Sequence, residues 1–214
     1  MTMVIAFSWK DKIIVMADSR ISRQSDSKVT EFYDDRVKIY PVNGNLLISQ
    51  SGATIIRLDE QGNFLDVSDV ISDFVKMNGN REQLVAVEGE SAIRDLIDYW
   101  NKILLKNDLD PNNYDVNFLL CGWMNGVTPA IYCYSSETNK IDEGNRVIGD
   151  KEALKIIYPY IQEDLENKTF EEVLRHYKHG FNKVIQHVET VGGDLHIYEL
   201  NQNPKLSKWI SRPF

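Results

Sequence analysis

The sequence predicts an α+β fold, because its strand-like and helix-like segments occur in separate blocks. Along the 214 residues the order is strands, two helices, strands, two helices and a last strand. Such segregation favours α+β over a doubly wound sheet. Several expected strands are apolar on both faces, as in residues 13–17, which is typical of strands covered on both sides. We therefore expect a four-layer α-β-β-α sandwich, with helices outside and two antiparallel sheets inside.

The first half of the chain predicts two hairpins followed by two helices. Short polar connections between β-rich runs indicate each hairpin, and Ser68 offers a hydroxyl for capping the first helix. Residues 54–66 fit either a third hairpin or a helix interrupted at Gly62. The expected elements are strands at 3–9 and 12–17, a polar loop or exposed hairpin at 21–35, strands at 36–42 and 46–51, and helices at 69–77 and 91–106.

The second half repeats the order of strands followed by helices. Thr169 is the expected N-cap of the last helix, with Glu171 and Glu172 in its first turn. Residues 203–214 are predicted to form a polar tail of a single domain that spans residues 1–214. The expected elements are strands at 116–123, 130–134, 140–142 and 146–148, helices at 151–165 and 170–188, and a strand at 195–200.

Composition excludes several classes of protein. The chain has 24 Lys and Arg against 32 Asp and Glu, a net charge of -8. This balance argues against binding to duplex nucleic acid or to an anionic membrane. No stretch approaches the roughly 20 apolar residues that span a bilayer, and the start lacks the basic region of a secretory signal. We therefore expect a cytoplasmic chain, with Cys121 and Cys133 as core residues.

The register of the first hairpin suggests a functional site. A two-residue loop pairs Trp9 with Lys12, which places Thr2 near Asp18, within the reach of side chains on neighbouring strands. A turn at residue 44 would bring Lys38 and Gly52 to one end of a sheet. The sequence thus predicts that a hydroxyl, a carboxylate and a cation meet there.

These residue types suit nucleophilic catalysis. If Met1 is removed, the α-amine of Thr2, with a reference pKa of about 8, can act as base for its own hydroxyl. Lys38 would stabilise the developing alkoxide, and Asp18 would keep Lys38 charged and oriented. The N–H of Gly52 could stabilise an oxyanion. An Asp–Lys pair with a purely structural role fits the same residues.

With these residues, the sequence resembles the β-type subunits of the proteasome family, which includes the bacterial HslV-type peptidase. Sixteen residues separate Thr2 from Asp18 and fourteen separate Lys38 from Gly52, as in the family pattern. The matching stretches are Ala17-Asp18-Ser19-Arg20, Lys38-Ile39, Ser51-Gly52-Ala53, residues 118–123 and 129–132, Val147-Ile148-Gly149 and Gly192-Gly193. The resemblance covers almost the whole chain in order.

The resemblance implies the N-terminal nucleophile hydrolase fold and a threonine-type endopeptidase. Thr2 would be the nucleophile that forms an acyl-enzyme, Asp18 and Lys38 its partners, and Gly52 an oxyanion donor. It also implies self-association into rings around a chamber, peptide or protein substrates, and often a separate ATPase unfoldase. We expect no cofactor and no metal. Only Met1 precedes Thr2, so no longer propeptide is expected.

Three features depart from the family pattern. Asp150 stands where the family commonly has a serine, and Val188 and Val191 replace an aspartate and a serine before the Gly-Gly pair. Residues 53–67 lack the expected uninterrupted helix. Two alternatives therefore stay open: a non-catalytic scaffold subunit of the same fold, and a small-amide hydrolase that uses the same nucleophile.

Two further signals are weaker. His176 and His179 are three residues apart on an expected helix, a spacing that can bind a metal, although a solvated helix face is the simpler interpretation. Trp209 in the expected tail is a candidate interface anchor.

Overall fold

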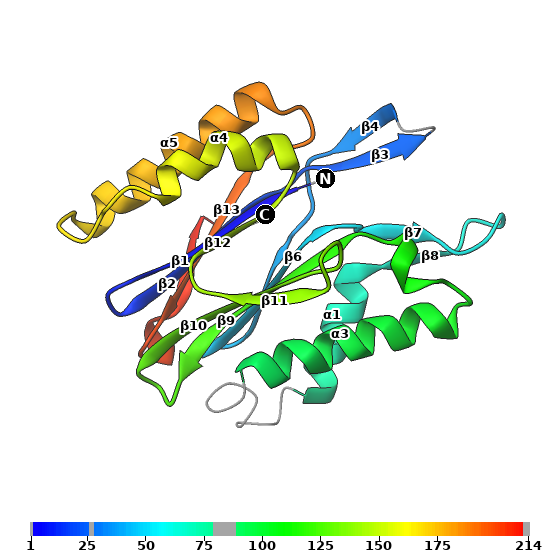
Figure 1. The fold of residues 1–214 in the computed structure, drawn as a ribbon, viewed down its shortest axis with the longest axis horizontal. Coiled ribbons are helices and arrows are strands. Elements are labelled where there is room, and N and C mark those ends of the chain that lie inside the picture. The colour runs from blue at the N-terminus through cyan, green and yellow to red at the C-terminus, as the bar shows by residue number, and fades with distance from the viewer. Residues whose placement is uncertain (1, 26–27, 79–88, 212–214) are drawn as a thin grey trace.

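The protein is an α+β chain whose computed structural model describes residues 2–25, 28–78 and 89–211. Within these ranges there are four α-helices and two five-stranded antiparallel sheets, together with two separate hairpins. Figure 1 shows two helices on each side of the strands, which fill the middle of the molecule. The predicted α+β class is confirmed.

The first sheet contains the N-terminal strands. Its β1–β2 hairpin pairs Trp9 with Lys12 and Val4 with Ala17, as the sequence predicts. Lys10 in the turn has a φ of 52°, the left-handed conformation that tight hairpin turns require. In spatial order the strands are β12 (Arg146–Gly149), β1 (Met3–Trp9), β2 (Lys12–Asp18), β13 (Leu195–Asn201) and β14 (Lys208–Ser211).

The second sheet is built around the central β9–β10 hairpin. Its strands are, in spatial order, β11 (Lys140–Glu143), β10 (Thr128–Ser135), β9 (Val116–Met124), β6 (Leu46–Gly52) and β5 (Ile39–Asn43). The short strands β11 and β12 are neighbours in sequence but belong to different sheets. The segment between them therefore crosses from one sheet to the other.

Two small hairpins account for the segments that the sequence left ambiguous. The polar region at 21–35 contains β3 (Ile21–Ser25) and β4 (Lys28–Tyr33). Residues 54–66 form a hairpin of β7 (Ile55–Arg57) and β8 (Phe64–Asp66), and not an interrupted helix. Gly62 in its turn has a φ of 90°. A right-handed helix cannot continue through a positive φ, and glycine adopts this conformation at little cost.

The helices begin close to the predicted positions but differ at two ends. Ser68 is not the cap of the first helix, because Asp66 accepts the Ser68 N–H at 2.8 Å and the helix starts at Val67, two residues earlier than a Ser68 cap predicts. The third helix ends at Ile161 and not at residue 165, where Asp164 accepts the Glu166 N–H in a competing local turn. The helices are α1 (Val67–Asn78), α3 (Gly89–Lys106), α4 (Lys151–Ile161) and α5 (Phe170–His187), with short 3-10 helices η1 (Pro111–Asn113) and η2 (Pro204–Leu206).

The C-terminal segment is more ordered than a polar tail. Its residues 208–211 form β14, which pairs with β13 at the edge of the first sheet. The Trp209 ring lies 5.1 Å from the Tyr198 ring, so this aromatic side chain packs on its own chain. Thr169, by contrast, caps α5 as predicted, in a reciprocal capping box with Glu172.

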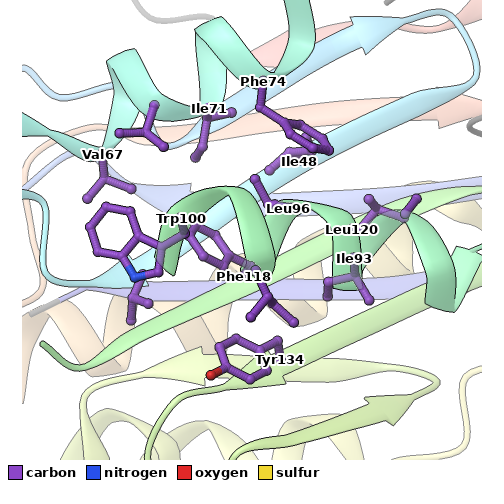
Figure 2. Close-up of a cluster of buried hydrophobic side chains, with 14 of the residues drawn as sticks. Ile48, Val67, Ile71, Phe74, Ile93, Leu96, Trp100, Phe118, Leu120 and Tyr134 are labelled. Carbon is purple, nitrogen blue, oxygen red and sulfur yellow. The ribbon is translucent and has the colours of Figure 1, made fainter. Parts of the chain in front are cut away.

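Three apolar clusters define the layers of the molecule. One lies between α1, α3 and the second sheet, a second between α4, α5 and the first sheet, and a third between the two sheets. Figure 2 shows the first cluster, where Trp100 and Leu96 of α3 and Ile71 and Phe74 of α1 gather over strand residues such as Phe118. Both sheets are therefore covered on both faces.

No helix in the described part of the chain has the length and apolar character needed to cross a membrane.

We predict that Trp100→Ala lowers the free energy of unfolding by about 3–5 kcal/mol. Trp100 is 1 % exposed and contacts Phe118 edge to face, so its removal leaves a large cavity between α3 and the sheet. Leu105→Ala on the same helix is the control, because Leu105 is 63 % exposed. Urea denaturation measures both, and equal losses for the two variants would contradict the proposed packing.

Candidate active site

A buried ion pair joins the two sheets at one end. The Lys38 Nζ lies 3.0 Å from the Asp18 Oδ1, and both side chains are 0 % exposed. Asp18 ends β2 of the first sheet, and Lys38 immediately precedes β5 of the second. The structure thus brings these two predicted site residues into direct contact.

The Asp18 carboxylate also holds two backbone groups. Its Oδ1 accepts the N–H of Met3 at 3.0 Å, and its Oδ2 accepts the N–H of Gly192 at 3.1 Å. Charge-assisted bonds of this kind are the stronger ones in proteins. Asp18 therefore fixes the start of β1 and the loop after α5 at the same time as it fixes Lys38.

Burial dominates the electrostatics of the pair. Desolvation lowers the pKa of Lys38, against the raising effect of the Asp18 charge and hydrogen bond. Desolvation likewise raises the pKa of Asp18, opposed by the Lys38 charge and the N–H groups of Met3 and Gly192. The Asp18 charge and hydrogen bond therefore oppose the desolvation of Lys38 and favour its ammonium form, which is the form that could stabilise a developing negative charge.

Thr2 immediately precedes Met3, whose N–H binds the Asp18 carboxylate. Thr2 is 1 % exposed, and its carbonyl oxygen accepts the N–H of Asp150 at 2.9 Å. Gly149 has a φ of 136°, and a Cβ at that position would collide with the Thr2 carbonyl oxygen. The start of β1 therefore needs a glycine at the end of β12.

Gly52 occupies the end of β6, in the same sheet as β5. Three residues before it, Ser49 pairs with Ile39 and donates its hydroxyl to the Lys38 carbonyl at 2.5 Å. Gly52 has a φ of 94°, and a Cβ there would collide with the Asp115 carbonyl. The close approach of these two segments is sufficient to explain the glycine, whatever role it has toward a substrate.

Arg20 is a member of the site to which sequence reasoning gave no role. Its carbonyl oxygen accepts a hydrogen bond from the Lys38 Nζ, and its N–H donates to the Gly192 carbonyl at 3.0 Å. Its guanidinium binds Asp34 through two bonds of 2.6 and 2.7 Å and reaches the Glu189 carbonyl at 3.0 Å. In the sequence, Arg20 is marked as a site residue only by its position two residues after Asp18.

The positions that depart from the family pattern have structural roles. The Asp150 Oδ1 caps α4 by accepting the Glu152 N–H at 2.8 Å, and its Oδ2 accepts the Thr190 hydroxyl at 2.6 Å. Val188 and Val191 belong to the apolar cluster beneath α4 and α5. Thr190 lies between these two valines in sequence, and its hydroxyl is the one that binds Asp150.

His196 is a buried titratable group near the ion pair. It lies on β13 opposite Ala17, is 3 % exposed, and its Nδ1 has no hydrogen-bond partner among the described residues. Burial lowers the pKa of His196, and the Lys38 charge lowers it further, against the charges of Asp194 and Asp18. The neutral imidazole is therefore favoured.

The remaining candidate residues do not form a metal site. Both ring nitrogens of His176 already have partners. Its Nε2 lies 2.9 Å from the Tyr160 carbonyl of α4, and its Nδ1 lies 3.5 Å from a carboxylate oxygen of Glu163, just after α4. The described ranges contain no group of three or more His, Cys, Asp or Glu side chains able to hold a metal. Cys121 and Cys133 are buried free thiols.

No protein-family model matches this sequence, and a search of curated proteins finds no significant relative.

We predict that Lys38→Met costs about 3–5 kcal/mol of unfolding free energy at pH 8, because it leaves the buried Asp18 carboxylate without its cation. Burial then raises the pKa of Asp18, so the folded variant binds a proton more tightly than the unfolded chain. The loss relative to wild type should therefore shrink as the pH falls from 8 to 5.

Lys76→Met is the matched control for this change. Lys76 pairs with Asp73, but the two side chains are 71 % and 58 % exposed, so its removal should cost under about 1 kcal/mol. Urea denaturation at both pH values measures the two variants. A loss for Lys38→Met that is the same at pH 8 and pH 5 would argue against a charged, buried partner.

His196 should make the folded protein sensitive to mild acid. Because its folded-state pKa lies below the ordinary value of about 6.5, the unfolded chain binds the proton first, and stability is lost as the pH falls below that value. His196→Gln should flatten this part of the stability profile, whereas His179→Gln on the exposed face of α5 should not. Parallel slopes for wild type and His196→Gln between pH 7 and 5.5 would refute the assignment.

Proposed function

We propose that the chain is a proteasome-like, threonine-type peptidase subunit with the N-terminal nucleophile hydrolase fold. One observation carries this proposal. A fully buried Lys38–Asp18 pair holds the peptide group that immediately follows Thr2, through the bond from the Met3 N–H to Asp18. This bond ties the buried pair to the backbone next to Thr2, the residue that would carry the free amine and the hydroxyl once Met1 is removed.

The arrangement of the layers supports the proposed fold class. Each five-stranded antiparallel sheet packs against the other on one face and against a pair of helices on its other face. This arrangement supports the α-β-β-α sandwich that the resemblance implies. Assembly into rings, delivery of substrates by a separate ATPase and a cytoplasmic location are parts of the same proposal.

The proposed reaction begins when removal of Met1 frees the α-amine of Thr2. The amine accepts the hydroxyl proton while Oγ1 forms a bond to the carbonyl carbon of the substrate. The Lys38 charge stabilises the negative charge that develops on Oγ1. The C–N bond then breaks, and the departing amine takes the proton from the Thr2 ammonium. Water, deprotonated by the same amine, attacks the resulting ester, and Oγ1 leaves with a proton.

Two observations favour a second candidate, a non-catalytic subunit of the same fold. Thr2 is 1 % exposed in the chain that carries Met1, so the unprocessed form offers no access to its hydroxyl. The side chain of Asp150 is engaged by α4 and Thr190 and is not free to assist the Thr2 amine. The intact mass of the native protein separates the two candidates, because only a chain that starts at Thr2 has the free amine.

We expect Thr2→Ala to abolish peptide hydrolysis without unfolding the protein. The test uses a fusion whose cleavage leaves residue 2 as the first residue, so that the amine is free in every variant. Thr128→Ala is the control, because Thr128 is exposed on β10 and its loss should leave the rate unchanged. Steady-state hydrolysis of a fluorogenic peptide measures both.

Two results count against the peptidase. If Thr2→Ala keeps the activity, another residue is the nucleophile. If wild-type protein with a free Thr2 amine is folded but inactive toward a panel of peptides, the non-catalytic subunit is the better description.

A further inference from the structure

A buried hydrogen bond lies next to the proposed catalytic groups without belonging to them. The Thr190 hydroxyl donates to the Asp150 Oδ2 at 2.6 Å, and the two residues are 9 % and 6 % exposed. Asp150 caps α4, whereas Thr190 lies in the loop after α5. The bond therefore connects two segments that are distant in sequence, at the point where both approach the start of β1.

The peptide group between Thr2 and Met3 is held at both of its polar ends. Its carbonyl oxygen accepts the Asp150 N–H at 2.9 Å, and its N–H donates to the Asp18 Oδ1 at 3.0 Å. Because a peptide group is planar, two bonds at opposite ends fix the orientation of the plane. They thereby restrict the direction in which the Thr2 Cα and its side chain leave β1.

The loop after α5 joins these two holding points. Its Thr190 binds Asp150, and two residues later Gly192 donates its N–H to the Asp18 Oδ2 at 3.1 Å. The hydrogen bonds thus form a closed circuit that starts and ends at the peptide group after Thr2. A change at Thr190 is transmitted to that peptide group from both sides, through Asp150 and through the loop.

The Thr190 hydroxyl is the component of this circuit that a substitution can remove most cleanly. The Asp150 Oδ1 is already engaged by α4, so the hydroxyl satisfies the other carboxylate oxygen, which would otherwise be buried without a donor at a considerable cost. Loss of the hydroxyl should therefore shift Asp150, and with it the N–H that holds the Thr2 carbonyl.

We infer that Asp150 and Thr190 are positioning residues that orient Thr2 for attack, acting through the loop at 190–192 and the peptide group after Thr2. This inference rests on the proposed peptidase function. It assigns the orientation of the nucleophile to Asp150 and Thr190, whose side chains bind each other.

The test compares Thr190→Val with Thr190→Ser in protein whose first residue is Thr2. Valine keeps the shape but loses the hydroxyl, and we expect kcat for peptide hydrolysis to fall at least about tenfold with KM within about twofold, because small displacements of a reacting group are costly. Serine restores the donor and should recover most of the rate. Thr169→Val is the matched control, because it removes a hydroxyl that caps α5 next to Phe170, which packs on Trp9 at the opposite end of β1, and it should leave kcat unchanged.

Hydrogen exchange of the Met3 amide provides a readout that does not depend on catalysis. Thr190→Val should accelerate this exchange more than it accelerates exchange in the middle of α5, whereas Thr169→Val should do the reverse. Unchanged Met3 exchange, or a kcat for Thr190→Val equal to that of wild type, would overturn the inference. If wild-type protein hydrolyses no peptide, the proposed function fails, and Met3 exchange still decides whether the circuit holds the peptide group after Thr2.

Discussion

The ion pair between Lys38 and Asp18 is the interaction on which the rest of the structure depends. It is fully buried, it connects the two sheets, and its carboxylate also binds the backbone at Met3 and Gly192. Two charges removed from water are stable only when their remaining hydrogen-bonding capacity is used. Asp18 meets this condition with three donors, and Lys38 does so with Asp18 and the Arg20 carbonyl. The backbone at Met3 and Gly192 and the side chain of Lys38 are therefore all held by the one carboxylate of Asp18.

Two glycines near the ion pair allow neighbouring backbone segments to approach each other closely. Gly149 and Gly52 both have a positive φ, and at both positions a side chain would collide with a neighbouring carbonyl. Gly149 lets β12 approach Thr2, and Gly52 lets the end of β6 approach Asp115. Such close approaches require the apolar layers on either side to keep the sheets in register. The three hydrophobic clusters thus support the positions of the groups around Asp18 and Lys38 as well as the stability of the fold.

The sequence was informative where local rules determine the outcome. The two-residue turn at Lys10 set the β1–β2 register and hence the approach of the first strand to Asp18. Long-range contacts were not predictable in this way. The pairing of β14 with β13, the contacts of Arg20 with Asp34 and Glu189, and the bond from Thr190 to Asp150 join segments that no local pattern relates. The Asp66 cap of α1 was missed because two polar candidates, Asp66 and Ser68, lie within one turn.

The most direct test of the central claim is to locate a covalent intermediate. Protein with Thr2 as its first residue would be mixed with an activated peptide ester, quenched in acid and analysed by mass spectrometry of its peptides. Our account predicts one acyl group, carried by the Thr2 hydroxyl, which disappears when Lys38 is replaced by methionine. An acyl group on any other side chain, or none at all in protein that hydrolyses the ester, would contradict it.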